Sequence, residues 1–296
     1  MKVFITGSNG FIGSRLTVEL LREKYQVIGL ARSHDAAKRL QNMGAEILHG
    51  SLSDHESLHA GALQADAVIH LAFDPDFSRF REGSEMDARA IETLGKALIC
   101  SGKPFLVPTG MAGLAPSGTV IAEDTSIPVN YALPRISEQT ALSFASEGVS
   151  VSVIRLAQVH DIYKQGLVSG LIDIARHTGI SAYLEEGSQR WPAVHIQDTA
   201  RLFILALKAS KSGVKYHAVG EEGVEMRMIA DAIGRKLDLP VKSLDDEAAQ
   251  QHFGAFYMFI KQDMPATARN TMELLNWYPE GPTLISDLEH LEHLGY

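Results

Sequence analysis

A glycine-rich turn at the start of the chain constrains its fold more than any other feature. Residues 6–13 read TGSNGFIG, directly after the short apolar stretch Lys2 to Thr6. Apolar residues then recur at helical spacing, so the chain is predicted to open with a strand, a glycine turn and a helix. Gly7 permits a sharp turn, Gly10 a close approach to a diphosphate, and Gly13 tight packing of the helix on the strand. This order is typical of a dinucleotide site, in which the helix N-terminus binds the phosphates.

The whole turn is therefore predicted to hold a dinucleotide cofactor. The residues that we assign to it are Gly7, Asn9, Gly10, Phe11, Ile12 and Gly13.

The strand and helix order repeats through the first half of the chain. Further strands are predicted at Tyr25 to Ala31, Ala45 to His49, Ala67 to Leu71, Phe105 to Pro108 and Val149 to Ile154, with helices between them. Such alternation predicts an α/β fold, a doubly wound parallel sheet of the Rossmann type. Residues 109–130 are expected to form a loop, residues 134–147 a helix, and the rest short helices with few strands.

We expect two domains. Residues 1–160 are assigned mainly to the Rossmann domain and residues 161–296 mainly to a smaller C-terminal substrate lobe. A segment at about 191–219 is expected to return to the Rossmann domain.

The end of the second predicted strand bears on the choice of cofactor. NAD-specific sites place an acidic residue about 20 residues after the glycine turn, where it binds the ribose 2′-hydroxyl. This chain has Arg32 and Ser33 in that region instead. Since a guanidinium binds phosphate through paired, charge-assisted hydrogen bonds, NADP is favoured as cofactor and NAD stays possible.

Composition limits the partners and the compartment. The formal net charge of −9 argues against a nucleic-acid partner. Cys100, the one cysteine among 296 residues, rules out an internal disulfide and fits a reducing compartment. With no signal peptide or apolar spanning segment evident, we expect a cytoplasmic protein that has no membrane partner and is a monomer or homodimer.

Several motifs together resemble the extended short-chain dehydrogenase/reductase superfamily, which includes NAD-dependent epimerases and dehydratases. They are the TGxxGxxG turn, Gly50 to Asp54, His70 to Ala72, and Trp191 to Asp198. The resemblance covers nearly the whole chain and implies a small-molecule substrate. It also implies that Ser51 and Leu52 lie near the adenine, although Ser51 stands where the family usually has aspartate. The nicotinamide ribose would be lined by Leu71, Ala72 and Phe73.

The resemblance further implies hydride transfer between nicotinamide C4 and a carbon that bears oxygen. A tyrosine serves as acid/base, a lysine four residues later lowers its pKa, and a serine or threonine polarises the oxygen. Here Tyr131 and Arg135 have that separation. Thr109 follows the fifth predicted strand, although the pattern could equally place Gly110 at the serine position. Aligned on Glu138, however, the family pattern places Asn130 and Pro134 where tyrosine and lysine belong.

His160 is an alternative proton donor, because it follows the sixth predicted strand and imidazole titrates near neutrality. No metal site is expected. The stretch His55 to His59 matches the zinc-protease pattern HExxH, but it lies within the nucleotide domain with no third ligand identifiable.

These features favour an oxidoreductase acting on a CH–OH or carbonyl group. An epimerase or dehydratase of the same fold is the nearest alternative. The departure from the tyrosine and lysine pattern leaves open a second class, a regulator that senses NADP(H) without turnover.

Overall fold

A computed structural model of the chain describes residues 1–74, 79–129 and 133–292. The chain divides into two compact units. Unit 1 comprises Met1–Thr109, Leu133–Arg155 and Thr199–Tyr216. Unit 2 comprises Gly110–Ala132, Leu156–Asp198 and His217–Tyr296.

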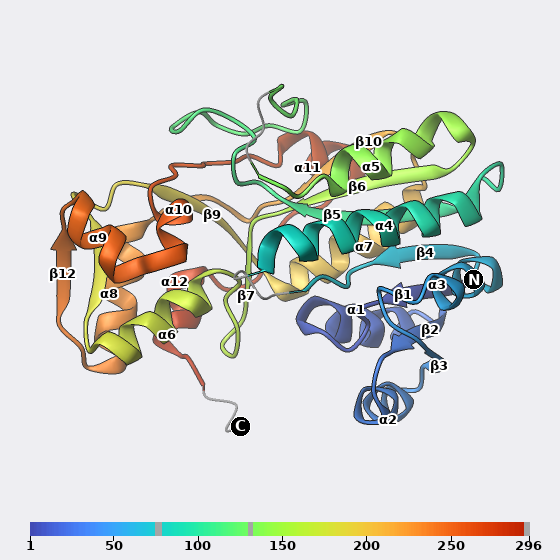
Figure 1. Cartoon of the computed structure of the whole chain (residues 1–296), viewed down its shortest axis with the longest axis horizontal. Coiled ribbons are helices and arrows are strands. Elements are labelled where there is room, and N and C mark those ends of the chain that lie inside the picture. Colours follow the sequence, from blue (N-terminus) through green and yellow to red (C-terminus); the bar gives the residue numbers. More distant parts are fainter. Residues whose placement is uncertain (75–78, 130–132, 293–296) are drawn as a thin grey trace. The chain divides into compact units, whose positions relative to one another are not determined.

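Strands and helices alternate through the first part of the chain, as Figure 1 shows. In chain order they are β1 (Lys2–Thr6), α1 (Phe11–Arg22), β2 (Gln26–Ala31), α2 (His34–Met43), β3 (Glu46–His49), α3 (His55–Gln64), β4 (Ala67–His70), α4 (Phe80–Leu98), β5 (Pro104–Gly110), α5 (Ser137–Ser143), the 3-10 helix η2 (Phe144–Glu147) and β6 (Ser150–Leu156).

Seven strands form the main sheet in the order β10-β6-β5-β4-β1-β2-β3, where β10 is Val214–Ala218. The pairs β1–β2, β1–β4, β2–β3 and β4–β5 are parallel. Strand order therefore reverses between β1 and β4, which is the position where open α/β sheets bind ligands beyond their carboxyl ends. The predicted Rossmann-type fold class is confirmed.

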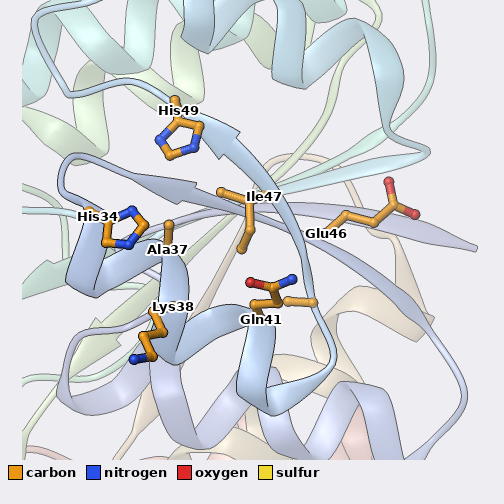
Figure 2. Close-up of a pocket in the computed structure, with 8 residues that line it drawn as sticks. His34, Ala37, Lys38, Gln41, Glu46, Ile47 and His49 are labelled. Carbon is orange, nitrogen blue, oxygen red and sulfur yellow. The ribbon is translucent and has the colours of Figure 1, made fainter.

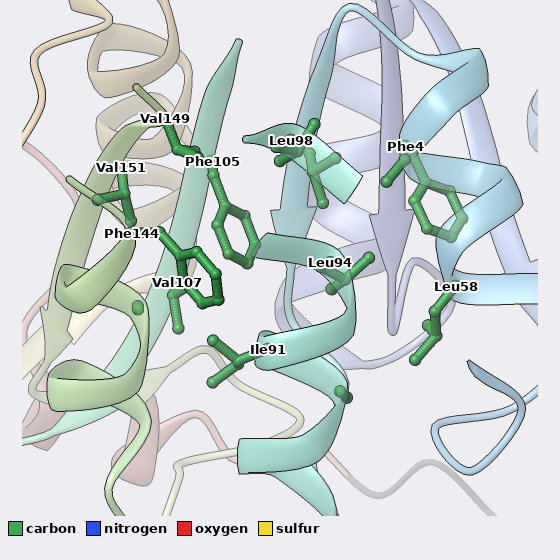
Figure 3. Close-up of a cluster of buried hydrophobic side chains, with 14 of the residues drawn as sticks. Phe4, Leu58, Ile91, Leu94, Leu98, Phe105, Val107, Phe144, Val149 and Val151 are labelled. Atoms are coloured by element: carbon green, nitrogen blue, oxygen red, sulfur yellow. The ribbon is translucent and has the colours of Figure 1, made fainter. Parts of the chain in front are cut away.

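A continuous apolar core holds helices against this sheet. Phe4 of β1 and Phe105 of β5 are completely buried, as are Ile91, Leu94 and Leu98 of α4. Figure 3 shows α4 presenting its three apolar side chains toward the strands. Because these three recur at helical spacing, they form one stripe, and its burial fixes the rotation of α4 about its axis. Any other residue on the stripe is buried with them.

The later elements are shorter. In chain order they are β7 (Gln158–His160), α6 (Val168–Thr178), β8 (Ser181–Leu184), β9 (Arg190–His195), α7 (Ile196–Ala209), β10, β11 (Glu221–Glu225), α8 (Met226–Leu237), β12 (Val241–Leu244), α9 (Asp246–Phe253), η3 (Gly254–Phe256), α10 (Tyr257–Ile260), α11 (Arg269–Leu275) and α12 (Leu284–Glu289). Within unit 2, β11-β9-β7 form a three-stranded sheet and β12-β8 a two-stranded one.

The helix expected at about residues 134–147 is present, but it begins only at Ser137 and becomes a 3-10 helix at Phe144. The expectation of few strands after residue 154 was wrong, because β7 to β12 all lie there among the described residues. These strands are three to six residues long, too short for an alternating pattern to stand out.

Among the described residues, no helix is both long and apolar enough to cross a bilayer.

Candidate cofactor and active site

The glycine turn after β1 brings main chain close to main chain. Gly7 has a φ of +68°, and a Cβ there would lie 2.6 Å from the amide nitrogen of Ala72. A Cβ at Gly13 would lie 2.0 Å from the carbonyl oxygen of Gly7. Both positions therefore require glycine. Gly7 requires it because of its positive φ and the close Ala72 backbone, and Gly13 because of the close Gly7 backbone alone. The turn is held against the carboxyl end of β4.

The start of α1 is suited to an anionic ligand. Its N-cap, Gly10, is exposed and provides no side-chain capping bond among the described residues. Asn9, Phe11 and Ile12 around it are partly exposed. Since the first amides of a helix have no partner within the helix, a diphosphate fits this cradle. The residues present thus match the cofactor that the turn predicts.

Arg32 and Ser33 lie between β2 and α2. Arg32 is exposed, and Ser33 caps α2 by accepting a hydrogen bond from the amide of Ala36 at 3.2 Å. A hollow of about 540 Å³ lies between α2 and β3. Figure 2 shows His34 and Lys38 of α2 on one side of it and His49 of β3 on the other. Nitrogen-bearing side chains therefore gather around the start of α2.

The two residues expected near the adenine differ in their contacts. The Ser51 hydroxyl lies 3.0 Å from the hydroxyl of Ser53, whereas Leu52 packs on the apolar core. Their contact with a nucleotide stays a prediction.

The segment after β4 is fixed by Thr6. The amide of Leu71 donates to the Thr6 carbonyl at 3.0 Å, and the amide of Ala72 donates to the Thr6 hydroxyl oxygen at 3.2 Å. Phe73 comes next, and its ring centroid lies 4.1 Å from the guanidinium carbon of Arg135. The predicted ribose-lining segment and one predicted catalytic residue are thus in contact.

Several contacts hold Arg135 at the carboxyl end of β5. Its Nε donates to Ser137 Oγ at 2.9 Å, and its Nη2 donates to the Pro108 carbonyl oxygen at 3.2 Å. The side chain retains 19% exposure, and Nη1 makes no hydrogen bond to the described part of the chain. Arg135 therefore presents a fixed cation with one unused donor group.

Thr109 is the residue after Pro108 and is 5% exposed. Its hydroxyl has no hydrogen-bond partner among the described residues. Thr109 and Arg135 thus place hydrogen-bond donors that are unused among the described residues at the carboxyl end of β5. Thr6 and the glycine turn lie at the same edge of the sheet, at the carboxyl end of β1.

Two residues are predicted as the acid/base group, Tyr131 and His160. Tyr131 lies outside the described residues. His160 lies in unit 2, is completely buried, and its Nδ1 is 2.6 Å from Asp287 Oδ2. The role of His160 as a proton donor stays a prediction.

His160 belongs to a buried pair of imidazoles. The ring of His195 lies 5.7 Å from it, edge to face, and His195 Nε2 lies 3.8 Å from Asp287 Oδ2. Burial lowers the pKa of His195, and the charge of Asp287 only partly offsets this effect.

Sequence reasoning missed Asp87 and His70. Asp87 lies on α4 with 1% exposure, and both of its oxygens accept hydrogen bonds, from His70 Nε2 at 3.1 Å and from Ser137 Oγ. A signal for Asp87 was present: it precedes Ile91 by four residues and so falls on the apolar stripe of α4. A lone acid on such a stripe indicates a buried, paired charge.

Comparison with known proteins agrees with the fold. Residues 3–92 match the model of the NAD dependent epimerase/dehydratase family. An uncharacterized protein of Schizosaccharomyces pombe is 40% identical over 97% of this chain and 98% of its own. A ketoreductase of Stigmatella aurantiaca, acting on a 3-oxo-4-farnesyl dihydroquinoline oxide, is 24% identical over 77% of this chain and 70% of its own.

Among solved structures, a dTDP-glucose 4,6-dehydratase from Streptomyces venezuelae with bound NAD has a TM-score of 0.79. It is 18% identical and covers 98% of this chain and 95% of its own. A UDP-glucuronic acid 4-epimerase from Bacillus cereus, also with NAD, has a TM-score of 0.76 at 18% identity, covering 98% of each chain. At this identity the likeness shows the fold alone.

Proposed function

Because the chain belongs to the extended short-chain dehydrogenase/reductase superfamily, we propose that it is an NAD(P)-dependent oxidoreductase acting on a CH–OH or carbonyl group of a small organic molecule. The observation that carries the proposal is the arrangement at the end of β5. There, the fixed guanidinium of Arg135 and the hydroxyl of Thr109, which has no hydrogen-bond partner within the described part of the chain, stand at the sheet edge where the dinucleotide turn also lies.

The division of roles follows from the groups present. A bound nicotinamide supplies or accepts hydride. Thr109 and Arg135 donate hydrogen bonds to the substrate oxygen and stabilise negative charge that develops on it during carbonyl reduction. Tyr131, four residues before Arg135 in the sequence, is the proposed proton donor, and a guanidinium placed beside its phenol would lower the pKa of that phenol.

We propose NADP(H) as the preferred cofactor. Support comes from Arg32, which is exposed at the end of β2, and from His34 and Lys38 on the following helix. All three can face a 2′-phosphate with positive charge or N–H donors. The same helix turn also carries Asp35, so the preference must be measured directly for both coenzymes.

The test is a titration of the purified protein with NADPH and NADH, followed by a panel of ketones and aldehydes with each coenzyme. We expect tighter binding of NADPH and substrate-dependent NADPH oxidation. Thr109→Val and Arg135→Gln each remove a donor aimed at the substrate oxygen and are expected to lower kcat about 100-fold. Tyr131→Phe is expected to lower it similarly. Tighter NADH binding would overturn the cofactor preference.

A non-catalytic sensor of NADP(H) is the second candidate. The observation in its favour is that Asn130 and Pro134 stand where the superfamily pattern has tyrosine and lysine. A protein that binds NADPH and oxidises it with no member of the panel would favour this reading. Nucleotide-sugar substrates belong in the panel, because the epimerase or dehydratase alternative predicts product formation without net coenzyme oxidation.

We further propose that the protein acts in the cytoplasm as a monomer or homodimer, on small molecules only. Fractionation of cells and sedimentation of the purified protein test these two points.

A further inference from the structure

Asp87 has a position that simple packing does not explain. It occupies the apolar stripe of α4, four residues before Ile91, and is 1% exposed. A buried carboxylate is costly unless it is paired and hydrogen-bonded. Its surroundings therefore indicate what it does.

One set of contacts leads from Asp87 to the proposed active-site cation. Ser137 donates its hydroxyl proton to Asp87 Oδ2 and accepts the Nε–H of Arg135 at 2.9 Å. The direct distance from Arg135 Nε to Asp87 Oδ2 is 3.8 Å. Arg135 is thus tied to Asp87 through charge and through one bridging hydroxyl.

A second set leads to the glycine turn. The other oxygen of Asp87 accepts the Nε2–H of His70 at 3.1 Å, and His70 Nδ1 is 2.8 Å from the hydroxyl oxygen of Thr6. Thr6 immediately precedes Gly7. Asp87, His70 and Thr6 are all at most 1% exposed, so solvent does not compete for these bonds.

Charge balance favours an ionised Asp87. Burial raises the pKa of this carboxyl, but the hydrogen bond from His70 and the charges of Arg135 and His70 outweigh burial, and the net pKa lies below its ordinary value. An ionised carboxylate can only accept hydrogen bonds, so His70 Nε2 and Ser137 Oγ are the donors in its two contacts.

We propose that Asp87 is a positioning residue. Through Ser137, Asp87 holds the Arg135 guanidinium in a fixed position relative to the cofactor turn, and Asp87 is itself joined to that turn through His70 and Thr6. The expected effect of Asp87 on kcat rests on the proposed function, whereas the fixing of Arg135 by Asp87 does not. Asp87 touches neither substrate nor cofactor in this assignment and acts through Arg135.

The geometric part is tested without turnover. In protein labelled with ¹⁵N-arginine, the Nε–H signal of Arg135, assigned by its loss in Arg135→Lys, is expected to be protected from exchange at neutral pH. Asp87→Asn and Ser137→Ala should abolish that protection, and Ser137→Thr should retain it. Ser84→Ala is the matched control, because Ser84 is a buried polar residue of α4 whose hydroxyl, among the described residues, bonds only to the Phe80 carbonyl.

The kinetic part uses a double-mutant cycle. Asp87→Asn is expected to lower kcat about 10- to 100-fold, the scale of a misplaced catalytic group, with little change in the Kd for NADPH. In an Arg135→Gln background the same change should cost almost nothing, because its target is gone. Equal losses in both backgrounds would show a merely structural role and overturn the proposal.

The outcomes separate the two hypotheses. Loss of Arg135 protection in Asp87→Asn, together with a wild-type protein that reduces nothing, would overturn the proposed reaction and support the positioning. Protection that survives Asp87→Asn would overturn the positioning whatever the activity. Circular dichroism and NADPH binding of each variant establish that it is folded.

Discussion

Glu138 and Arg155 form a buried ion pair with two hydrogen bonds, from Nε to Oε2 at 2.8 Å and from Nη2 to Oε1 at 2.7 Å. Arg155 is completely buried and Glu138 is 4% exposed. The pair joins α5 to β6 and, because Ser137 precedes Glu138, it fixes where the network around Arg135 begins.

Breaking this pair is expected to be costly. Glu138→Gln leaves the charge of Arg155 buried without its counter-ion, and the free energy of unfolding should fall by about 3–5 kcal/mol. Urea unfolding measures it. Glu92→Gln makes the same change in the exposed Lys96–Glu92 pair and should cost at most about 1 kcal/mol. Equal effects of the two substitutions would contradict the role given to burial.

Gly7 is expected to tolerate no side chain. Gly7→Ala combines backbone strain with a Cβ 2.6 Å from the Ala72 amide, so it should destabilise the fold and abolish coenzyme binding. Gly102 is a matched control, since its φ of +65° is close to the +68° of Gly7 but no atom of residues 1–74, 79–129 or 133–292 lies within 4 Å of its Cβ position. Gly102→Ala should cost about 1–3 kcal/mol of strain and leave coenzyme affinity unchanged.

Arg32 is expected to discriminate between coenzymes. Arg32→Gln removes one charged partner of the 2′-phosphate and should weaken NADPH binding about 10- to 100-fold, a range set by charge-assisted hydrogen bonds. NADH binding should not change, because NADH lacks that phosphate. Arg39→Gln, at an exposed position of α2, serves as control, and a fluorescence titration with each coenzyme measures the affinities. A parallel loss of affinity for both coenzymes would argue against this assignment.

His195 is expected to make stability depend on pH. Burial lowers its pKa below the ordinary 6.5, so below that pH the unfolded chain binds a proton that the folded chain resists. Stability should therefore fall as pH drops from about 6.5 toward the lowered pKa of the folded state. His195→Gln should flatten this part of the profile of urea midpoints, whereas His177→Gln, at an exposed position, should not.

The parts of the structure that sequence could predict are those set by neighbouring residues. The glycine turn, the order of the first five strands and the stripe on α4 all follow from local spacing, and the fold class follows from them. Arg135 could be nominated from its separation from Tyr131. The contacts of Arg135 could not be predicted, because Ser137, Asp87 and His70 meet only when α4, α5 and β4 are assembled. The apolar stripe of α4 indicates that Asp87 is buried and paired, but it does not identify the partner. The short strands of unit 2 were missed for the related reason that pairing, rather than pattern, defines them.

The anchoring of Arg135 on a carboxylate from another helix bears on protein engineering. Grafting the loop that contains Arg135, together with α5, into a relative would transfer the guanidinium without Asp87, which fixes its position. An exchange of catalytic properties between members of the superfamily would then require moving two separate stretches of chain together.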